Sequence, residues 1–222
     1  CEKPLCINVR ELAEIKKIYA TTNGELFVGL NRKFAPLVQS LKKDLKGQFG
    51  NKIINIVVNA GYIPASHWTQ NEKIGGGRLI GEAIHFVDLA QFIDGSPIQD
   101  LNIRYLESKS FNNNDNAIIT LKLESGSIAN IIYTSMGSKK HKKELIRVFS
   151  SGQVFEIFNY LRLKKYSSFK IDKLKIKQDK GVINEYQFIY ETLTSNNNNN
   201  YLNDTFNNHE KLINRLNFYK NV

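Results

Sequence analysis

The 222-residue sequence is poor in cysteine, methionine, tryptophan and proline, with two, one, one and four of them respectively. Cys1 and Cys6 are too few for a disulfide framework, and no other Cys or His is spaced to complete a zinc site with them. We expect ordinary thiols in a reducing cytoplasm and no bound metal. No run approaches the ~18–20 apolar residues that a membrane span needs. The first residues also do not have the basic segment and long apolar core of a signal peptide.

Acidic residues are fewer than basic ones, 21 against 31, and the formal net charge is +10. A basic surface can attract nucleic acid. The lysines are scattered, however, and the one dense cluster, Lys139-Lys140-His141-Lys142-Lys143, is short. Because it lies between two strand-like runs, Ile128–Thr134 and Leu145–Ser150, we predict a solvated hairpin loop there and no nucleic-acid partner.

The first part of the chain has the pattern of one αβ unit. Apolar residues from Val9 to Ala20 have helical spacing, with Asn8 as a predicted N-cap. A turn leads to a short, mostly apolar run, Leu26–Leu30, that predicts a buried strand. A second helix is predicted from about Pro36 to Lys46.

The rest of the chain predicts a large sheet. A strand is expected at Ile53–Ala60 and a helix from about Ile80 to Phe92. Period-two runs joined by polar turns then indicate a meandering antiparallel sheet. The runs are Leu101–Leu106, Ala117–Leu123, Ile128–Thr134, Leu145–Ser150, Gln153–Phe158 and a weaker one near Tyr166–Ile171. Two helices around residues 186–193 and 212–219 flank a polar segment, 196–200. The predicted class is therefore α+β: a large, mostly antiparallel sheet with helices on one face, preceded by the αβ unit.

The helix from Ile80 to Phe92 carries the candidate chemistry. At 100° per residue Phe86 and Leu89 should face the core, with Glu82 in the same arc and His85 at its edge. Asp88 is next to His85 at i+3. A His near a carboxylate can move a proton near neutral pH. A satisfied buried Glu–His pair without function, or a helix whose amphipathic pattern is irregular, explains the pattern equally well.

The glycines before this helix, Gly75-Gly76-Gly77, suit a ligand-binding mouth or a plain turn. They are not the G-x-G-x-x-G fingerprint that binds dinucleotides after a strand. No segment of the sequence has that motif.

Together these residues resemble the glucose-fructose oxidoreductase and inositol dehydrogenase family (Gfo/Idh/MocA). Glu2-Lys3-Pro4 is similar to a motif near the end of that family's N-terminal Rossmann domain. The glycine-rich stretch followed by a helix with His85 and Asp88 is similar to its catalytic segment. The whole arrangement looks closest to bi-domain oxidoreductases of bacterial surface-polysaccharide clusters.

The resemblance implies roles for several residues. Lys3, His85 and Glu82 would be catalytic, with His85 taking the proton of a substrate hydroxyl. Glu2, Lys3, Pro4, Asn31 and Arg32 would lie on the cofactor side, toward NAD or NADP. His67, Trp68, Arg78 and Asp88 would bind a sugar or nucleotide-sugar substrate. The sheet would form a homo-oligomer interface.

Two departures from the family pattern limit this reading. Many members have Asp four residues before the catalytic His, where this chain has Gly81; Glu82 is three before it. The second departure is that most of the Rossmann domain is missing. Residues 1–31 would be the remnant of a truncated Rossmann domain, and 32–222 the C-terminal substrate-binding and oligomerisation domain. Without the phosphate-binding part we expect the chain alone to bind no cofactor and to be inert.

Two other readings stay open. The chain could be a non-catalytic sugar-binding or dimerisation module that has kept the sheet. A basic nucleic-acid binder would explain the charge, but neither the glycines nor the inward-facing His and Glu.

Overall fold

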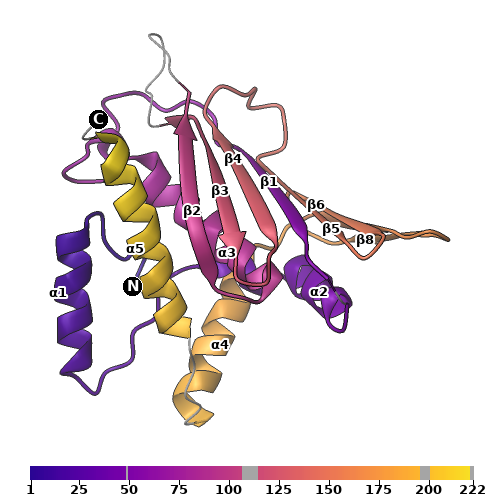
Figure 1. The fold of residues 1–222 in the computed structure, drawn as a ribbon, viewed down its shortest axis with the longest axis horizontal. Helices are drawn as coiled ribbons and strands as arrows, with labels where there is room; N and C mark the ends of the chain where they lie inside the picture. The colour runs from indigo at the N-terminus through magenta and orange to yellow at the C-terminus, as the bar shows by residue number, and fades with distance from the viewer. Residues whose placement is uncertain (49, 107–114, 196–200, 221–222) are drawn as a thin grey trace.

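The structure, a computed structural model, describes residues 1–48, 50–106, 115–195 and 201–220. Eight strands form one sheet in the order β2-β3-β4-β1-β5-β6-β7-β8 (Figure 1). The strands are β1 Ile53–Asn59, β2 Ile98–Tyr105, β3 Ala117–Leu123, β4 Ile128–Thr134, β5 Glu144–Ser150, β6 Gln153–Phe158, β7 Arg162–Tyr166 and β8 Ile171–Lys175. Only β1 and β4 are parallel among these strand pairs, so the predicted mostly antiparallel sheet is confirmed.

A row of isoleucines across the sheet shows why the strands pair in this register. Ile119 of β3 is opposite Ile131 of β4, which is opposite Ile56 of β1. Ile56 is in turn opposite Ile146 of β5, and Ile146 opposite Ile157 of β6. All five side chains are buried, at 0–1% exposure. A slip of one residue in any strand would turn its isoleucine to the open face and lose about 1.5–3 kcal/mol.

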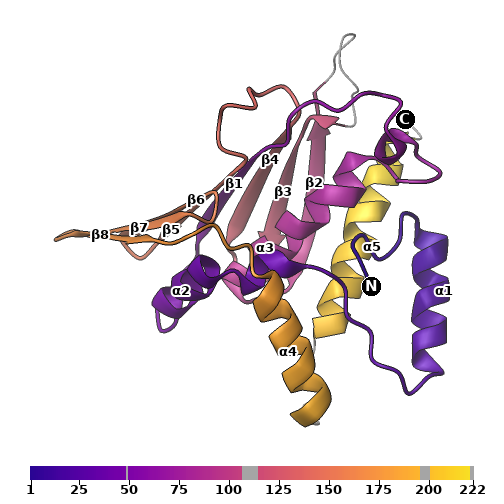
Figure 2. The ribbon, with the colours of Figure 1, turned by 180° about the vertical axis from the view of Figure 1, so that it is seen from behind.

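Helices cover the face of the sheet on which this row lies. The helices are α1 Val9–Ala20, α2 Pro36–Leu45, α3 Ile84–Asp94, α4 Val182–Ser195 and α5 Tyr201–Lys220. Helix α3 packs on β3 and β4, α5 on β2, and α2 on β6 and β7 (Figure 2). The opposite face, which is toward the viewer in Figure 1, has no helix across it among the described elements. The prediction of helices on one face is confirmed.

The N-terminal segment confirms one half of the predicted αβ unit and corrects the other. Helix α1 has the predicted bounds, and the Asn8 side chain caps it by accepting from the Glu11 N–H at 2.9 Å. Residues 26–30 do not form a strand of a sheet, and the Leu30 N–H donates to Val28 O, which makes a tight turn at Gly29. The Gly29 N–H donates to Cys1 O, and the amino group of Cys1 donates to Phe27 O, which is the hydrogen-bond pattern of two parallel strands. Pairing with one residue alone is too short to make a ladder.

One loop prediction and one strand prediction are wrong. Residues 139–143 do not connect a hairpin, because β1 lies between β4 and β5 and the loop crosses over its end. The run near Tyr166–Ile171 is mostly the turn between β7 and β8. A local alternating pattern does not reveal that β1 is inserted between β4 and β5, because its partner strands are about 75 and 90 residues away in the sequence. It also does not distinguish a strand from the polar turn of a hairpin. Residues 196–200, predicted as a polar linker, lie outside the described residues.

The described part of the chain has neither a membrane-spanning helix nor a cluster of metal ligands. No helix there is both long and apolar enough to span a membrane. No group of three or more His, Cys, Asp or Glu side chains is placed to hold a metal ion.

Candidate functional site

Four segments that are far apart in the sequence meet around one cavity of about 650 Å³. They are the N-terminal residues 2–7, Arg32, the stretch 68–86 that runs into the helix carrying His85, and Lys143 at the end of the β4–β5 crossover loop. We call this the His85 cavity. Eight predicted site residues line it: Glu2, Lys3, Pro4, Arg32, Trp68, Arg78, Glu82 and His85.

His85 lies directly after an irregular turn of its helix. Residues Leu79–Ala83 form a π-helical turn that continues into α3, a feature often found at functional sites. Only 5% of His85 is exposed, and its Nδ1 atom has no hydrogen-bond partner among the described residues. Burial, followed by the positive charges of Arg32 and Lys3, lowers its pKa well below 6.5. The imidazole is therefore neutral at pH 7 and able to accept a proton.

Lys3 joins the N-terminal segment to the same turn. Its Nζ donates to the carbonyl oxygen of Gly81 at 2.6 Å. Burial is the main cause that lowers the Lys3 pKa, although Glu82 raises it. The ammonium is thus held at the cavity wall, one helical turn from His85.

Glu82 is bound by cations and not by His85. Its carboxylate accepts from Arg78 at 3.1 Å and lies 3.4 Å from the Lys143 ammonium. Burial alone would raise the Glu82 pKa, but Lys143 and Arg78 outweigh burial and lower it. No Glu82–His85 hydrogen bond is formed among the described residues, so the hypothesis of a satisfied buried Glu–His pair is wrong. The π-helical turn explains the error, since it breaks the 100° spacing assumed for a regular helix.

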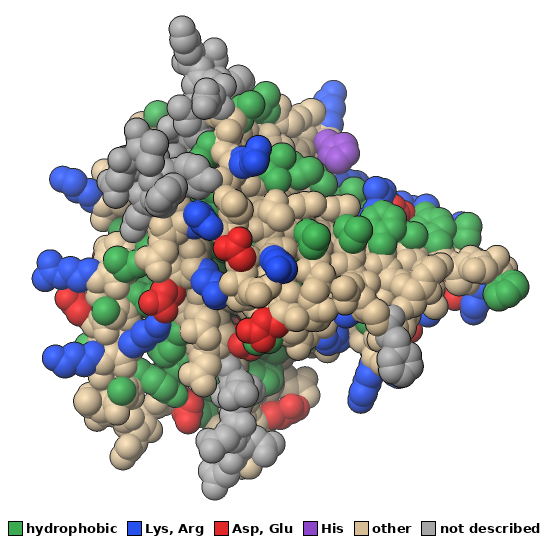
Figure 3. All heavy atoms as spheres, viewed as in Figure 1, with side chains coloured by type: hydrophobic (Ala, Val, Ile, Leu, Met, Phe, Trp, Pro, Cys, Tyr) green, Lys and Arg blue, Asp and Glu red, His purple; other side chains and the backbone are tan. Residues whose placement is uncertain are grey.

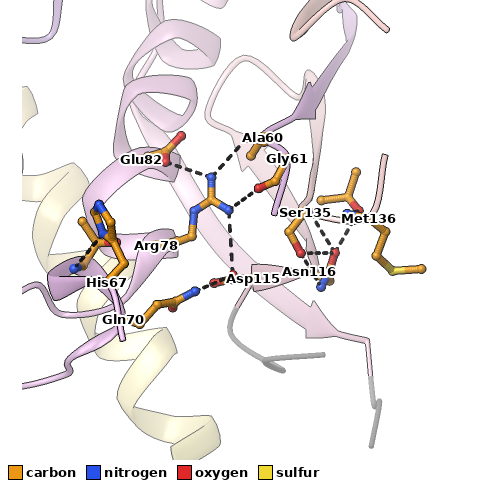
Figure 4. Close-up of polar contacts among 12 residues, drawn as sticks. Ala60, Gly61, His67, Gln70, Arg78, Glu82, Asp115, Asn116, Ser135 and Met136 are labelled. Atoms are coloured by element: carbon orange, nitrogen blue, oxygen red, sulfur yellow. Dashed lines mark hydrogen bonds and ion pairs between the residues drawn. The ribbon is translucent and has the colours of Figure 1, made fainter. Parts of the chain in front are cut away.

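Arg78 holds the wall of the cavity together (Figure 4). Its guanidinium donates to Gly61 O at 2.6 Å and to Glu82, and lies 3.8 Å from Asp115. The side chain is only 3% exposed. Arg78 therefore connects the end of β1, the start of β3 and the helix, a structural role that leaves little of it for a ligand.

The glycines before the helix are required by packing. A Cβ on Gly75 would lie 2.5 Å from Thr69 Cα and 2.8 Å from Trp68 O. Gly76 has φ +69°, and a Cβ there would lie 2.9 Å from Ile7. These close approaches bring the loop and the N-terminal segment together, and Gly75 itself lines the cavity. The ligand-mouth and turn readings are therefore compatible.

Arg32 reaches the cavity from the other side. Its Nε and Nη2 donate to the buried Glu144 at 3.2 and 3.3 Å, and Lys180 donates to the same carboxylate at 2.7 Å. Asn31 accepts from Arg32 and donates to Lys180 O at 2.9 Å. Asn31 is buried and does not line the cavity.

Two further predicted residues lie outside the cavity lining. Asp88 is 4% exposed and paired with Lys33 at 2.8 Å, on another part of α3. Burial raises its pKa and outweighs the effect of Lys33. His67 is exposed and bonds to Thr69, although its neighbour Trp68, 61% exposed, does line the cavity.

Sequence reasoning missed Lys143, Glu144 and Lys180. Lys143 belongs to the basic cluster for which the sequence predicts a solvated hairpin loop, and Glu144 begins a strand with an otherwise ordinary pattern. The available signal was a charged residue at the buried start of a strand, since inward charge is costly unless paired. Which cations would pair with it depended on the insertion of β1 beside β5.

The fold and the cavity define a class: an α+β domain that presents a neutral histidine and a lysine to one pocket. Residues 46–205 match the family described as the oxidoreductase family, C-terminal alpha/beta domain. This range is most of the chain, and the chain belongs to that Gfo/Idh/MocA family.

Individual relatives are more distant. Myo-inositol 2-dehydrogenase of Thermotoga maritima is 25% identical over 162 residues, which cover 70% of this chain and 48% of that protein. The curated relatives are matched over less than half of their own length.

Solved structures share the fold. An NAD-binding oxidoreductase of Klebsiella pneumoniae has a TM-score of 0.79 at 15% identity, covering 96% of this chain and 68% of that one. The transcriptional regulator Gal80p of Kluyveromyces lactis has a TM-score of 0.77 at 17% identity, covering 99% and 67%. Similarity at this level of identity shows the fold alone.

Proposed function

We propose that this chain is the substrate-binding C-terminal domain of an NAD(P)-dependent oxidoreductase that acts on a sugar or nucleotide-sugar hydroxyl. The supporting observation is the His85 cavity, in which segments about 80 residues apart place Lys3 beside the helical turn that carries His85. Buried titratable groups with shifted pKa values in one cavity are the usual mark of an acid–base site.

In this proposal His85 is the general base. The neutral imidazole accepts the proton of the substrate hydroxyl, and Lys3 orients that hydroxyl and stabilises the negative charge that develops on its oxygen. A bound NAD(P)⁺ would supply the acceptor for the hydride that leaves the substrate carbon. Glu82 acts through its ion pairs, which keep Arg78 and Lys143 at the cavity wall. Trp68 offers an exposed ring against which a sugar can pack.

The residues of this chain fit only one end of the cofactor. Glu2, Lys3, Pro4 and Arg32 line the cavity where a nicotinamide would approach, with Asn31 behind Arg32. The sequence has no G-x-G-x-x-G loop to hold a pyrophosphate. We therefore propose that residues 1–31 belong to a dinucleotide-binding domain and 32–222 to the substrate domain, and that the 222-residue chain alone is inert.

The proposal extends to assembly and location. Ile118, Ile128, Ile132 and Phe149 are 38–46% exposed on the open face of the sheet, where Figure 3 shows hydrophobic side chains among polar ones. They support a homo-oligomer formed through this face. Two free cysteines support a cytoplasmic location. We propose no nucleic-acid or membrane partner. His67 and Asp88, outside the cavity, are weaker substrate-binding candidates.

A non-catalytic sugar-binding or dimerisation module is the second candidate. The observation that favours it is the same fold in a protein described as a transcriptional regulator. The two candidates differ in the chemistry of His85: a module needs no titratable group at its ligand, whereas the enzyme needs the imidazole beside the reacting hydroxyl.

The test is a titration of the isotope-labelled protein with myo-inositol, N-acetylglucosamine and UDP-N-acetylglucosamine, with its four histidines observed by NMR. We expect at least one ligand to shift the His85 resonances saturably, while His209, which does not line the cavity, serves as the internal reference. A ligand that binds without affecting His85 would favour the module. No binding by any of the three would contradict the proposed substrate class.

A further inference from the structure

The His85 cavity has more positive than negative side chains. Four cations line it, Lys3, Arg32, Arg78 and Lys143, against two carboxylates, Glu2 and Glu82. The two arginines are engaged by acids behind the wall: Arg32 by Glu144, and Arg78 by Asp115 as well as Glu82. The positive charge left for a ligand is therefore that of the two lysines, reduced by Glu82, which lies 3.4 Å from Lys143, and by Glu2.

Lys143 is the more available of the two. Its side chain is 41% exposed, and its Nζ is 3.4 Å from a Glu82 carboxylate that is already bonded to Arg78. Its backbone is fixed, because Lys143 O accepts from Asn59 N–H at 2.8 Å at the end of β1. The partly exposed ammonium of Lys143 thus extends from a backbone that is hydrogen-bonded to the end of β1 at the cavity wall.

The crossover loop adds charge beside the cavity wall. Lys139, Lys140 and Lys142 are exposed. The Lys139 side chain lies close to Gly61, whose carbonyl binds Arg78 in the cavity wall. Figure 1 shows this loop leaving the top of β4 and returning to β5. The basic cluster of the sequence is therefore next to the candidate site and not on a remote hairpin.

The cations around the cavity also act on His85. After burial, the causes that lower the His85 pKa are all cations: Arg32, Lys3, Lys143 and Lys180. A positive potential at the imidazole favours a ligand whose negative charge compensates it.

We propose that Lys143, with Lys3 and the lysines of the crossover loop, makes the His85 cavity selective for a sugar that carries an anionic group, a phosphoryl or a carboxylate. The ammonium of Lys143 binds the anion as a point charge, while the sugar hydroxyl faces Lys3 and His85. This inference rests on the proposed function and narrows its substrate class.

The test compares probes that differ in one group. Isothermal titration of the 222-residue protein at low salt uses N-acetylglucosamine, N-acetylglucosamine 1-phosphate, glucuronate and inorganic phosphate. We expect the sugar phosphate to bind at least about tenfold more tightly than the neutral sugar, as one charge-assisted hydrogen bond supplies. The preference should weaken as salt is raised. The glucuronate titration decides whether the anion is a carboxylate or a phosphoryl group.

Variants locate the effect. Lys143→Met should remove the preference, Lys143→Arg should retain most of it, and Lys173→Met on β8 should leave it unchanged although it alters net charge equally. Equal affinity for the sugar and its phosphate, a preference that survives Lys143→Met, or phosphate alone binding as tightly as the sugar phosphate would overturn the proposal. The proposed function survives those results if the neutral sugar still shifts His85. If no sugar binds, the proposed function itself fails.

Discussion

Replacing Glu144 with glutamine should destabilise the protein strongly, because one buried carboxylate neutralises two cations. The Glu144 side chain is 0% exposed and binds Arg32 and Lys180. Glutamine keeps its shape and removes its charge. Breaking a buried ion pair by removing one partner costs about 3–5 kcal/mol. Since the Arg32 and Lys180 side chains are 13% and 26% exposed, water reaches both cations, and we expect the lower end, about 3 kcal/mol.

The free energy of unfolding is measured by urea denaturation followed by circular dichroism. For a chain of this size the loss corresponds to a fall in Tm of about 6–12 °C. The matched control is Glu14→Gln, which removes an exposed pair with Arg10 whose side chains are 63% and 89% exposed. That pair is worth about 0.3–0.5 kcal/mol. A Glu144→Gln protein within about 1 kcal/mol of the parent at pH 7 would refute the reasoning.

The same substitution has a predicted pH dependence. Burial would raise the Glu144 pKa, but Arg32 and Lys180 outweigh it and hold the pKa below the ordinary value of 4.5. A carboxylate with a lowered pKa stabilises the folded state fully above its ordinary pKa, and this contribution is lost as the pH falls through the folded-state value. The difference in free energy of unfolding between the parent and the Glu144→Gln variant should therefore have its full value at pH 7 and become smaller below pH 4.5.

Three further outcomes are expected. Gly181→Ala should lower the free energy of unfolding by more than about 1 kcal/mol, because Gly181 has φ +84° and a Cβ there would collide with the backbone of Phe34 and Ala35. The control is Gly24→Ala, since a Cβ on Gly24 would have no atom within 4 Å. Equal urea midpoints for the two variants would contradict this prediction. Burial raises the pKa of Cys6 to about 12, so a thiol reagent at pH 8 should label only exposed Cys1 in the native protein and both cysteines in urea. Fluorescence titration with NADH should show no saturable binding up to millimolar concentration, whereas micromolar binding would show that the chain builds a cofactor site.

Much of the fold was predictable because its signals are local. The bounds of α1, β3, β4 and β6 match those expected from periodicity, since alternate residues of these strands face one packed layer. The position of β1 was not predictable, because its partners are distant in the sequence. Residues 26–30 have the apolar pattern of a strand, and that pattern does not show whether a partner strand is present.

The candidate site was predictable in its residues more than in its connections. Lys3 and His85 were identified from the resemblance and the helical pattern, and both line the cavity. The partners of Glu82 were not foreseen, because the π-helical turn changes the spacing and Lys143 arrives from a loop across β1. Asp88, three residues after His85, looked like its partner and instead pairs with Lys33.

The most direct test of His85 as a neutral base is its own titration. The imidazole resonances of labelled protein, assigned with a His85→Asn variant, would be followed by NMR from pH 8 down to the onset of unfolding. We predict a ring that stays neutral well below pH 6.5, because burial and the surrounding cations lower its pKa. A midpoint at or above 6.5 would contradict both the burial of His85 and the positive cavity around it.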